Sequence, residues 1–186
     1  FARIIRAAGR EVVECPLAQV DGFYTMDFDA WDAQMTGRET MLILCSPHNP
    51  GGRVWTEAEL RGVADFAKRH DLVLVSDEIH HDLVLPGHKH RAMATVAGDI
   101  ADRLVMMTAT TKTFNLAGGH SGNVIIADPD LRARFAGRMM ALGISPNSFG
   151  PTMATAAYTP EGARWVDDLT GYLAGQMPFD EGPRQF

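Results

Sequence analysis

The chain has 186 residues, of which 46% are hydrophobic, and a formal net charge of −6 at pH 7. A chain of this size and hydrophobic content can bury one substantial core, which excludes a disordered tail. We expect neither a nucleic-acid nor a membrane partner. The net charge is acidic, no long run of lysine or arginine occurs, and no apolar run reaches about 18 residues.

Short apolar runs alternate with segments of helical periodicity along the chain. Three nearly continuous apolar runs predict buried strands at residues 41–45, 72–75 and 104–107, and a further strand is expected at 123–127. Strands that alternate with helices are typical of a mostly parallel sheet with helices on both faces. The sequence therefore predicts an α/β fold with three layers, α/β/α.

The clearest helix lies between the first two strands. Thr56 stands three residues before Glu59, which is the spacing of a capping box, and apolar residues then recur at helical spacing up to His70. Further helices are expected at residues 130–142 and 160–174. A strand, a helix and a strand in this order predict a right-handed crossover that makes the two strands parallel.

Polar segments follow each of the three buried strands. Asn49 follows the first strand, Asp77 the second and Lys112 the third. Because the carboxyl ends of parallel strands meet at one edge of the sheet, these three side chains are candidates to share one pocket. Each also has a simpler interpretation, since Asn49 could belong to a tight turn, Asp77 could cap a strand end, and Lys112 could be a solvated charge.

Together the three side chains match one chemistry, because pyridoxal phosphate needs an amine, a carboxylate at its ring nitrogen and a donor at its phenolic oxygen. Three motifs resemble the fold-type I pyridoxal-phosphate enzymes: Asn-Pro-x-Gly from Asn49, Asp-x-x-His from Asp77, and Thr-x-x-Thr-Lys ending at Lys112. The longer segments 46–55, 76–82 and 111–118 are similar to the cystathionine β-lyase, or carbon-sulfur lyase, branch of the class I and II aminotransferases.

The resemblance implies a role for each matching residue. Lys112 would hold the cofactor covalently and move the proton at the substrate α-carbon, and Asp77 would pair with the ring nitrogen. Asn49 would donate to the phenolic oxygen, and His80 stands where many relatives have a tyrosine that contacts the same oxygen.

The phosphate group is expected to lie beside the segment that carries Lys112. Thr108 and Thr111 match hydroxyl positions that hold the phosphate in the family. His120 stands where many relatives place an arginine on the phosphate, and a histidine can also donate there.

The resemblance also implies an organisation for the whole chain. Residues 1–145 would form the central part of an aspartate aminotransferase-like large domain, and residues 146–186 an interdomain helix and the start of a small carboxyl-terminal domain. Both ends of the chain look incomplete. A homodimer is expected because relatives assemble their active sites across a two-fold interface.

Three functions remain open. The first is a β-lyase that releases a thiol, ammonia and pyruvate from a cysteine-type amino acid, and the second is an aminotransferase that moves an amino group to a 2-oxo acid. The third is a truncated, inactive domain.

The remaining histidines and the cysteines do not predict a metal site. No CxxC or HExxH pattern occurs, and His88 and His90 are expected to be solvated loop residues. The two cysteines, Cys15 and Cys45, stand far apart in the sequence, which favours a reducing, cytoplasmic setting.

Overall fold

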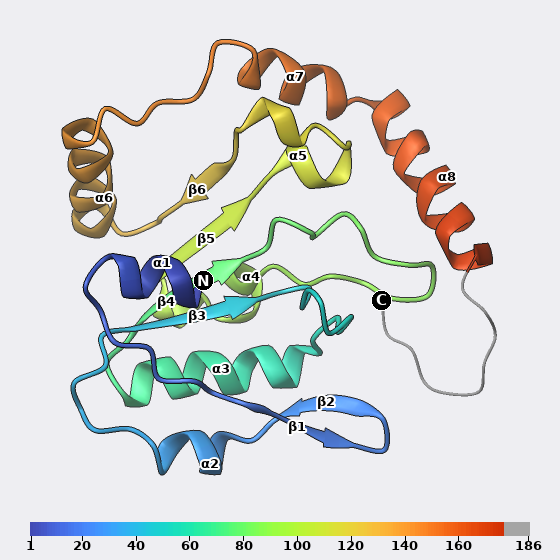
Figure 1. Cartoon of the computed structure of the whole chain (residues 1–186). Coiled ribbons are helices and arrows are strands. Elements are labelled where there is room, and N and C mark those ends of the chain that lie inside the picture. The colour runs from blue at the N-terminus through green and yellow to red at the C-terminus, as the bar shows by residue number, and fades with distance from the viewer. Residues whose placement is uncertain (177–186) are drawn as a thin grey trace.

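A four-stranded sheet lies at the centre of the protein in the computed structural model, which describes residues 1–176 (Figure 1). The strands are β3 (Met41–Cys45), β4 (Val73–Asp77), β5 (Leu104–Thr108) and β6 (Asn123–Ile125), in that spatial order. The first three run parallel, and β6 is antiparallel to β5. The predicted fold class, an α/β protein with a mostly parallel sheet, is confirmed.

Helices and one hairpin surround this sheet. The helices are α1 (Ala2–Ala7), α2 (Phe28–Asp32), α3 (Glu57–Arg69), α4 (Met93–Val96), α5 (Thr110–Thr113), α6 (Pro129–Ala141), α7 (Gly150–Ala157) and α8 (Pro160–Gln176). Short 3-10 turns occur at Gly98–Ile100 (η1) and Ala117–Gly119 (η2), and β1 (Leu17–Val20) pairs with β2 (Phe23–Met26) in a separate hairpin. The three predicted helices are present as α3, α6 and α8, within a few residues of the expected bounds.

Helix α3 begins as the sequence predicts. The Thr56 hydroxyl accepts a hydrogen bond from the Glu59 amide at 3.2 Å, and the Glu59 carboxylate accepts one from the Thr56 amide at 2.8 Å. This capping box satisfies two backbone amides that the first turn leaves free. The helix then connects β3 to β4 and makes the two strands parallel neighbours.

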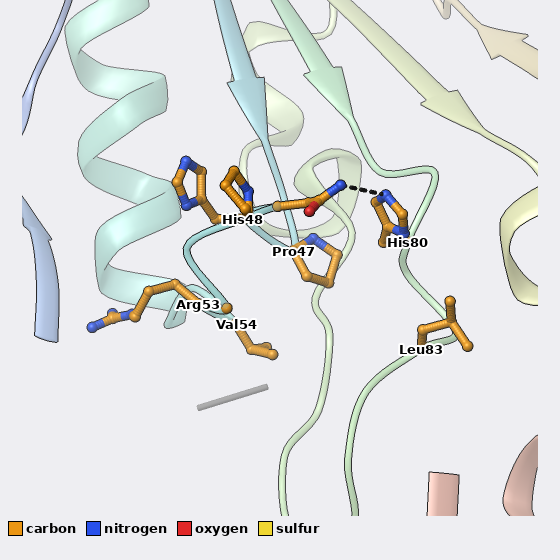
Figure 2. Close-up of a pocket in the computed structure, with 9 residues that line it drawn as sticks. Pro47, His48, Arg53, Val54, His80 and Leu83 are labelled. Atoms are coloured by element: carbon orange, nitrogen blue, oxygen red, sulfur yellow. Dashed lines mark hydrogen bonds between the residues drawn. The ribbon is translucent and has the colours of Figure 1, made fainter. Parts of the chain in front are cut away.

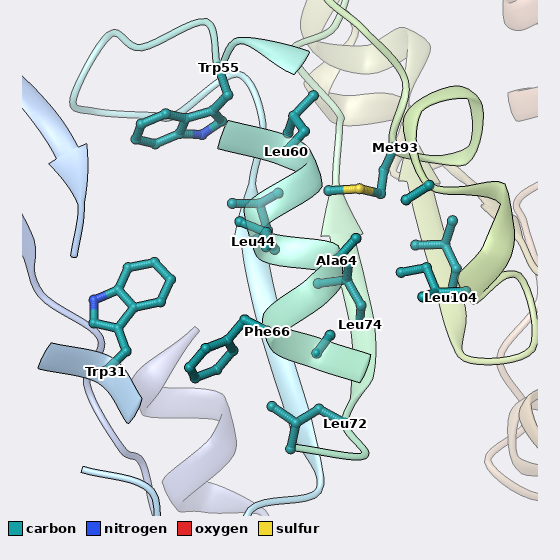
Figure 3. Packing of buried hydrophobic residues seen from close by; sticks show 14 residues of the cluster. Trp31, Leu44, Trp55, Leu60, Ala64, Phe66, Leu72, Leu74, Met93 and Leu104 are labelled. Carbon is teal, nitrogen blue, oxygen red and sulfur yellow. The ribbon is translucent and has the colours of Figure 1, made fainter. Parts of the chain in front are cut away.

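The main hydrophobic core lies between α3 and the sheet (Figure 3). Leu60 and Phe66 of α3 are almost fully buried, as is Leu74 of β4. Side chains alternate between the two faces of a strand, and the neighbours Val73 and Val75 on the other face are only half-buried in the described chain. Packing against α3 therefore fixes one face of the sheet more firmly than the other.

Phe66 stands at the centre of an aromatic group in this core. Its ring lies 5.8 Å from the Trp31 ring and 6.3 Å from the Phe28 ring, so α2 packs on α3 through these contacts. Substitution Phe66→Ala should lower the free energy of unfolding by about 3–5 kcal/mol, because it leaves a cavity in a packed region. Denaturant titration will measure this change. The matched substitution Phe135→Ala, on the exposed side of α6, should have a much smaller effect.

The pairing of β3, β4 and β5 aligns their carboxyl ends. Cys45 pairs with Asp77, and Asp77 pairs with Met107. Two further backbone bonds extend this alignment past the strand ends, from the Ser46 amide to the Asp77 carbonyl at 2.9 Å and from the Glu78 amide to the Met107 carbonyl at 2.8 Å. The polar segments that follow the three strands therefore start from the same edge of the sheet.

Candidate active site

A cavity of about 170 Å³ opens at the carboxyl ends of β3 and β4 (Figure 2). It lies between the loop that follows β3 and the loop that follows β4. Its walls consist of Pro47, His48, Asn49, Pro50, Gly52, Arg53, Val54, His80 and Leu83. Two of the predicted site residues, Asn49 and His80, thus line one cavity, although they are far apart in the sequence.

Asn49 and His80 are in direct contact across this cavity. The Asn49 amide Nδ2 lies 3.3 Å from Nε2 of His80 (Figure 2). An amide nitrogen can only donate, so Nε2 accepts and the ring proton resides on Nδ1. The second amide proton of Asn49 is left for another acceptor, and the contact holds the Asn49 amide in one orientation.

The pKa of His80 is lowered from its ordinary value of 6.5, first by burial and then by the positive charge of Lys112, against an opposing effect of Asp77. His80 is therefore neutral at pH 7, as its acceptor role requires. The charges of Lys112 and Asp77 thus act on the same imidazole in opposite directions.

Asp77 is the last residue of β4, and only 8% of its surface is exposed. Among residues 1–176 its carboxylate accepts one hydrogen bond, from the backbone N–H of Ile79 to Oδ1 at 3.3 Å. The other oxygen is available to a ligand. Burial, with the charge of Asp77, raises the pKa of the nearby Cys45 thiol, although a hydrogen bond from the backbone N–H of Asn49 opposes the rise. Cys45 therefore stays protonated at neutral pH and is a poor nucleophile.

Lys112 lies on α5, a helix of four residues that follows β5. Its side chain is exposed, whereas the neighbouring Thr111 and Thr113 are buried. The threonines anchor the helix, and the amine is free to reach a ligand. This arrangement suits an amine that forms and releases a covalent bond.

The three residues expected at a phosphate differ in their surroundings. Thr108 ends β5, and its hydroxyl accepts a hydrogen bond from the Asn123 amide at 3.3 Å, which leaves the hydroxyl proton available. Thr111 is 8% exposed and lies one residue before Lys112. His120 is exposed at the end of η2 with a left-handed backbone (φ 42°). The two threonines flank one strand-to-helix turn, whereas His120 lies farther along the chain at the end of η2, with no hydrogen bond to either threonine within the described residues.

Sequence reasoning missed a buried carboxylate beside Asp77. Glu78 is 1% exposed, and its carboxylate accepts hydrogen bonds from the Ser76 hydroxyl at 2.8 Å and the Met93 amide at 3.0 Å. His90 Nε2 lies 2.8 Å from the same carboxylate. The expectation that His90 is a solvated loop residue was wrong, because only 11% of its side chain is exposed. His90 lies 12 residues after Glu78 in the chain, so the local sequence gives no sign of this pairing.

Arg53 was also missed, although it closes the loop that carries Asn49. It is 7% exposed, forms an ion pair with Glu59, and its guanidinium lies 4.8 Å from the centre of the Trp55 ring. The capping glutamate of α3 thus also neutralises a buried cation. These contacts tie the loop after β3 to the first turn of α3.

The His80 contact predicts a dependence of stability on pH. Because the folded-state pKa lies below 6.5, the unfolded chain binds a proton more readily, and the free energy of unfolding should fall as pH decreases from about 6.5 toward the folded-state pKa. His80→Gln keeps an acceptor for Asn49 but does not titrate, so it should reduce this slope. Denaturant titrations from pH 7.5 to 5 will measure it. His88→Gln, in an exposed loop, should leave the slope unchanged.

No three His, Cys, Asp or Glu side chains gather in a metal-binding group within residues 1–176. None of the helices in that range has the length and apolar character needed to cross a membrane.

The chain is an α/β protein whose parallel strands end in an amide, a buried carboxylate and an exposed amine, at the edge of the sheet where such proteins commonly bind ligands. Residues 1–175 match the family model of aminotransferase class I and II, and the chain belongs to this family. This result confirms the family resemblance of the three motifs.

Individual relatives include both lyases and aminotransferases. The chain is 37% identical over 179 residues to cystathionine beta-lyase PatB of Bacillus subtilis (strain 168), covering 95% of this chain and 46% of that protein. Two solved structures that hold pyridoxal phosphate are similar. Cystalysin from Treponema denticola has a TM-score of 0.84 at 37% identity, with 90% of this chain and 43% of that one covered. A putative aminotransferase from Clostridium difficile 630 has a TM-score of 0.89 at 32% identity, with coverages of 95% and 46%. The chain thus spans under half the length of these relatives.

Proposed function

We propose that the protein binds pyridoxal 5′-phosphate and acts as a carbon-sulfur β-lyase on a cysteine-type amino acid such as cystathionine. The reaction takes up water and breaks the bond between sulfur and the β-carbon, and it yields a thiol, pyruvate and ammonia. The observation that carries the proposal is the Asn49–His80 contact at the edge of the sheet where β4 ends in the buried Asp77 and β5 leads into Lys112. The similarity to PatB and cystalysin supports the lyase reaction over others in the family.

The residues present fit this cofactor. The buried Asp77 carboxylate has an oxygen available for a protonated ring nitrogen, and the Asn49 amide has a proton available for a phenolic oxygen. The hydroxyls of Thr108 and Thr111, together with His120, would hold the phosphate. Each polar group of the cofactor thus has a partner of matching hydrogen-bonding type.

In the proposed reaction the side chains hold the substrate and move one proton. Pyridoxal phosphate, when bound, supplies a ring that accepts electrons from the substrate α-carbon. Lys112 Nζ would hold the cofactor and, after the substrate amine takes its place, remove the proton from the α-carbon. Asp77 would keep the ring nitrogen protonated, and His80 would keep the Asn49 amide directed at the phenolic oxygen.

A second candidate is an aminotransferase, which is supported by the similarity to the Clostridium difficile protein. Both reactions begin when a base removes the α-proton, and they differ in whether the sulfur substituent then leaves. Asn49, Asp77 and Lys112 would serve both reactions, so the geometry of the site does not favour one reaction over the other.

Two incubations test the proposal. Pyruvate formed from cystathionine without an amino acceptor supports the lyase, whereas activity only with an amino acid and 2-oxoglutarate supports the aminotransferase. A protein that stays colourless after addition of pyridoxal phosphate, with no visible band that borohydride removes, would leave only the third possibility, an inactive domain.

We further propose a homodimer in a reducing, cytoplasmic setting. Large apolar side chains exposed on described helices, such as Ile4, Met140 and Trp165, are consistent with a contact surface, and Cys15 and Cys45 form no disulfide. Light scattering will give the mass in solution. A monomeric mass at micromolar concentration would refute the dimer.

The division into residues 1–145 and 146–186 remains part of this proposal. Helices α7 and α8 lie within the second segment and follow one another along one side of the protein (Figure 1). Residues 177–186, which belong to the same predicted segment, lie outside the described residues.

A further inference from the structure

One carboxylate oxygen joins three separate segments next to Lys112. Oδ2 of Asp82 accepts a hydrogen bond from the Thr113 hydroxyl at 3.0 Å and another from the Tyr158 hydroxyl at 3.1 Å. Asp82 lies in the loop after β4, Thr113 ends α5, and Tyr158 caps α7. We call Asp82, Thr113 and Tyr158 the Asp82 latch.

The two donors of the latch differ in their access to water, since Thr113 is buried and Tyr158 is half-exposed. Thr113 is 1% exposed, so its hydroxyl has little access to water. Burial, with the charge of Asp82 and the hydrogen bond to it, raises the pKa of Tyr158 to about 12, and the phenol stays protonated as a donor. The other oxygen of Asp82 lies 3.3 Å from His81 Nε2. Hydrogen bonds to a charged acceptor are stronger than neutral ones.

Two aromatic rings contact Phe114, the residue after Thr113. The Phe114 ring lies 5.6 Å from the Tyr158 ring at a near right angle and 5.7 Å from the Trp165 ring in a stacked arrangement. Gly162 permits the close approach of α8 to α7, because a Cβ there would lie 1.8 Å from the Ala157 carbonyl oxygen. Tyr158 thus contacts both Asp82 and Phe114.

Helix α5 needs such external support. With four residues it is far shorter than a helix that is stable by itself in water. Thr113 and Phe114, the two residues after Lys112, are both held by groups outside α5. The position of the Lys112 backbone therefore depends on the loop after β4 and on the junction of α7 and α8.

We propose that the Asp82 latch is a positioning device for Lys112, which holds the short helix so that the amine meets the aldehyde of the cofactor in the reactive geometry. This inference rests on the proposed function of Lys112. The latch residues act through α5 and do not touch the substrate. Loss of one hydrogen bond should leave the fold intact but allow α5 to sample unproductive positions.

Two variants remove one hydroxyl each, Thr113→Val and Tyr158→Phe. Pyridoxal phosphate is added to the cofactor-free protein at 20 °C, and the rate constant for appearance of the visible band is measured. We expect a decrease of at least about tenfold in each variant, the size of a lost hydrogen bond to a charged group. Tyr172→Phe on the exposed side of α8 is the matched control and should react like the wild-type protein. A purely structural contact would lower the melting temperature without changing this rate.

Hydrogen exchange gives a second readout that needs no cofactor. The Phe114 amide donates to the Thr110 carbonyl at 3.0 Å and the Leu116 amide to the Thr111 carbonyl at 2.9 Å, so both report on α5. Both amides should exchange faster in the two latch variants than in the wild type. In the control variant their exchange rates should be unchanged. If the wild type forms the visible band, and the two variants form it at the same rate and show the same exchange rates of the Phe114 and Leu116 amides, the positioning role of the latch is refuted. If the wild type forms no band, the proposed function fails, and the exchange rates alone decide whether the latch holds α5.

Discussion

Replacement of Lys112 by alanine should abolish covalent capture of pyridoxal phosphate and lower the proposed β-lyase activity by at least about 10³-fold. Lys112 is the amine at the end of β5 whose charge reaches His80, and the other site residues cannot supply an amine. The visible band should be missing, and borohydride should fix no cofactor mass to the chain. Absorbance and intact mass will measure these two effects.

Lys89→Ala serves as the matched control, because Lys89 is an exposed lysine in the loop after β4. This variant should keep the band and the activity. A Lys112→Ala protein that still forms a borohydride-sensitive band would show that another amine holds the cofactor, and the proposed site would then be wrong.

Replacement of Asp77 by asparagine should lower the rate of pyruvate formation by about 10²–10³-fold while the visible band still forms. Asp77 is 8% exposed, so its charge would act on the ring nitrogen of the proposed cofactor with little screening by water. An asparagine has nearly the same shape but no charge to keep that nitrogen protonated. Steady-state rates with cystathionine, together with absorbance of the bound cofactor, will separate the loss of rate from loss of cofactor.

Asp167→Asn, at an exposed position of α8, is the control for this change and should react at the wild-type rate. Equal rates for Asp77→Asn and the wild type would remove Asp77 from the proposed mechanism. A variant that binds no cofactor would point instead to a role in affinity.

Much of the framework follows from local sequence pattern. The apolar runs at 41–45, 72–75 and 104–107 correspond to β3, β4 and β5, and the Thr56–Glu59 capping box marks the start of α3. These predictions succeed because burial on both faces demands continuous apolar residues and because helix caps act within a few residues.

The hairpin of β1 and β2 and two short helices were not predicted, although a local signal existed for the hairpin. Asp21 and Gly22, both with positive φ, form the two-residue turn between β1 and β2, and an Asp-Gly pair is a typical signal for such a hairpin. The short helices α4 and α5 have no periodic pattern long enough to predict. Tertiary contacts alone stabilise helices of this length.

The sequence by itself determined which chemical groups stand at the strand ends: the amide of Asn49, the carboxylate of Asp77 and the amine of Lys112. Only the tertiary structure decided how these groups are supported, through the neutral His80 beside Asn49, the buried pair of Glu78 and His90, and the contact of Asp82 with Thr113 and Tyr158. The reason is physical. A strand end is encoded by its own neighbours, whereas a hydrogen bond between distant segments depends on where the whole chain places both partners.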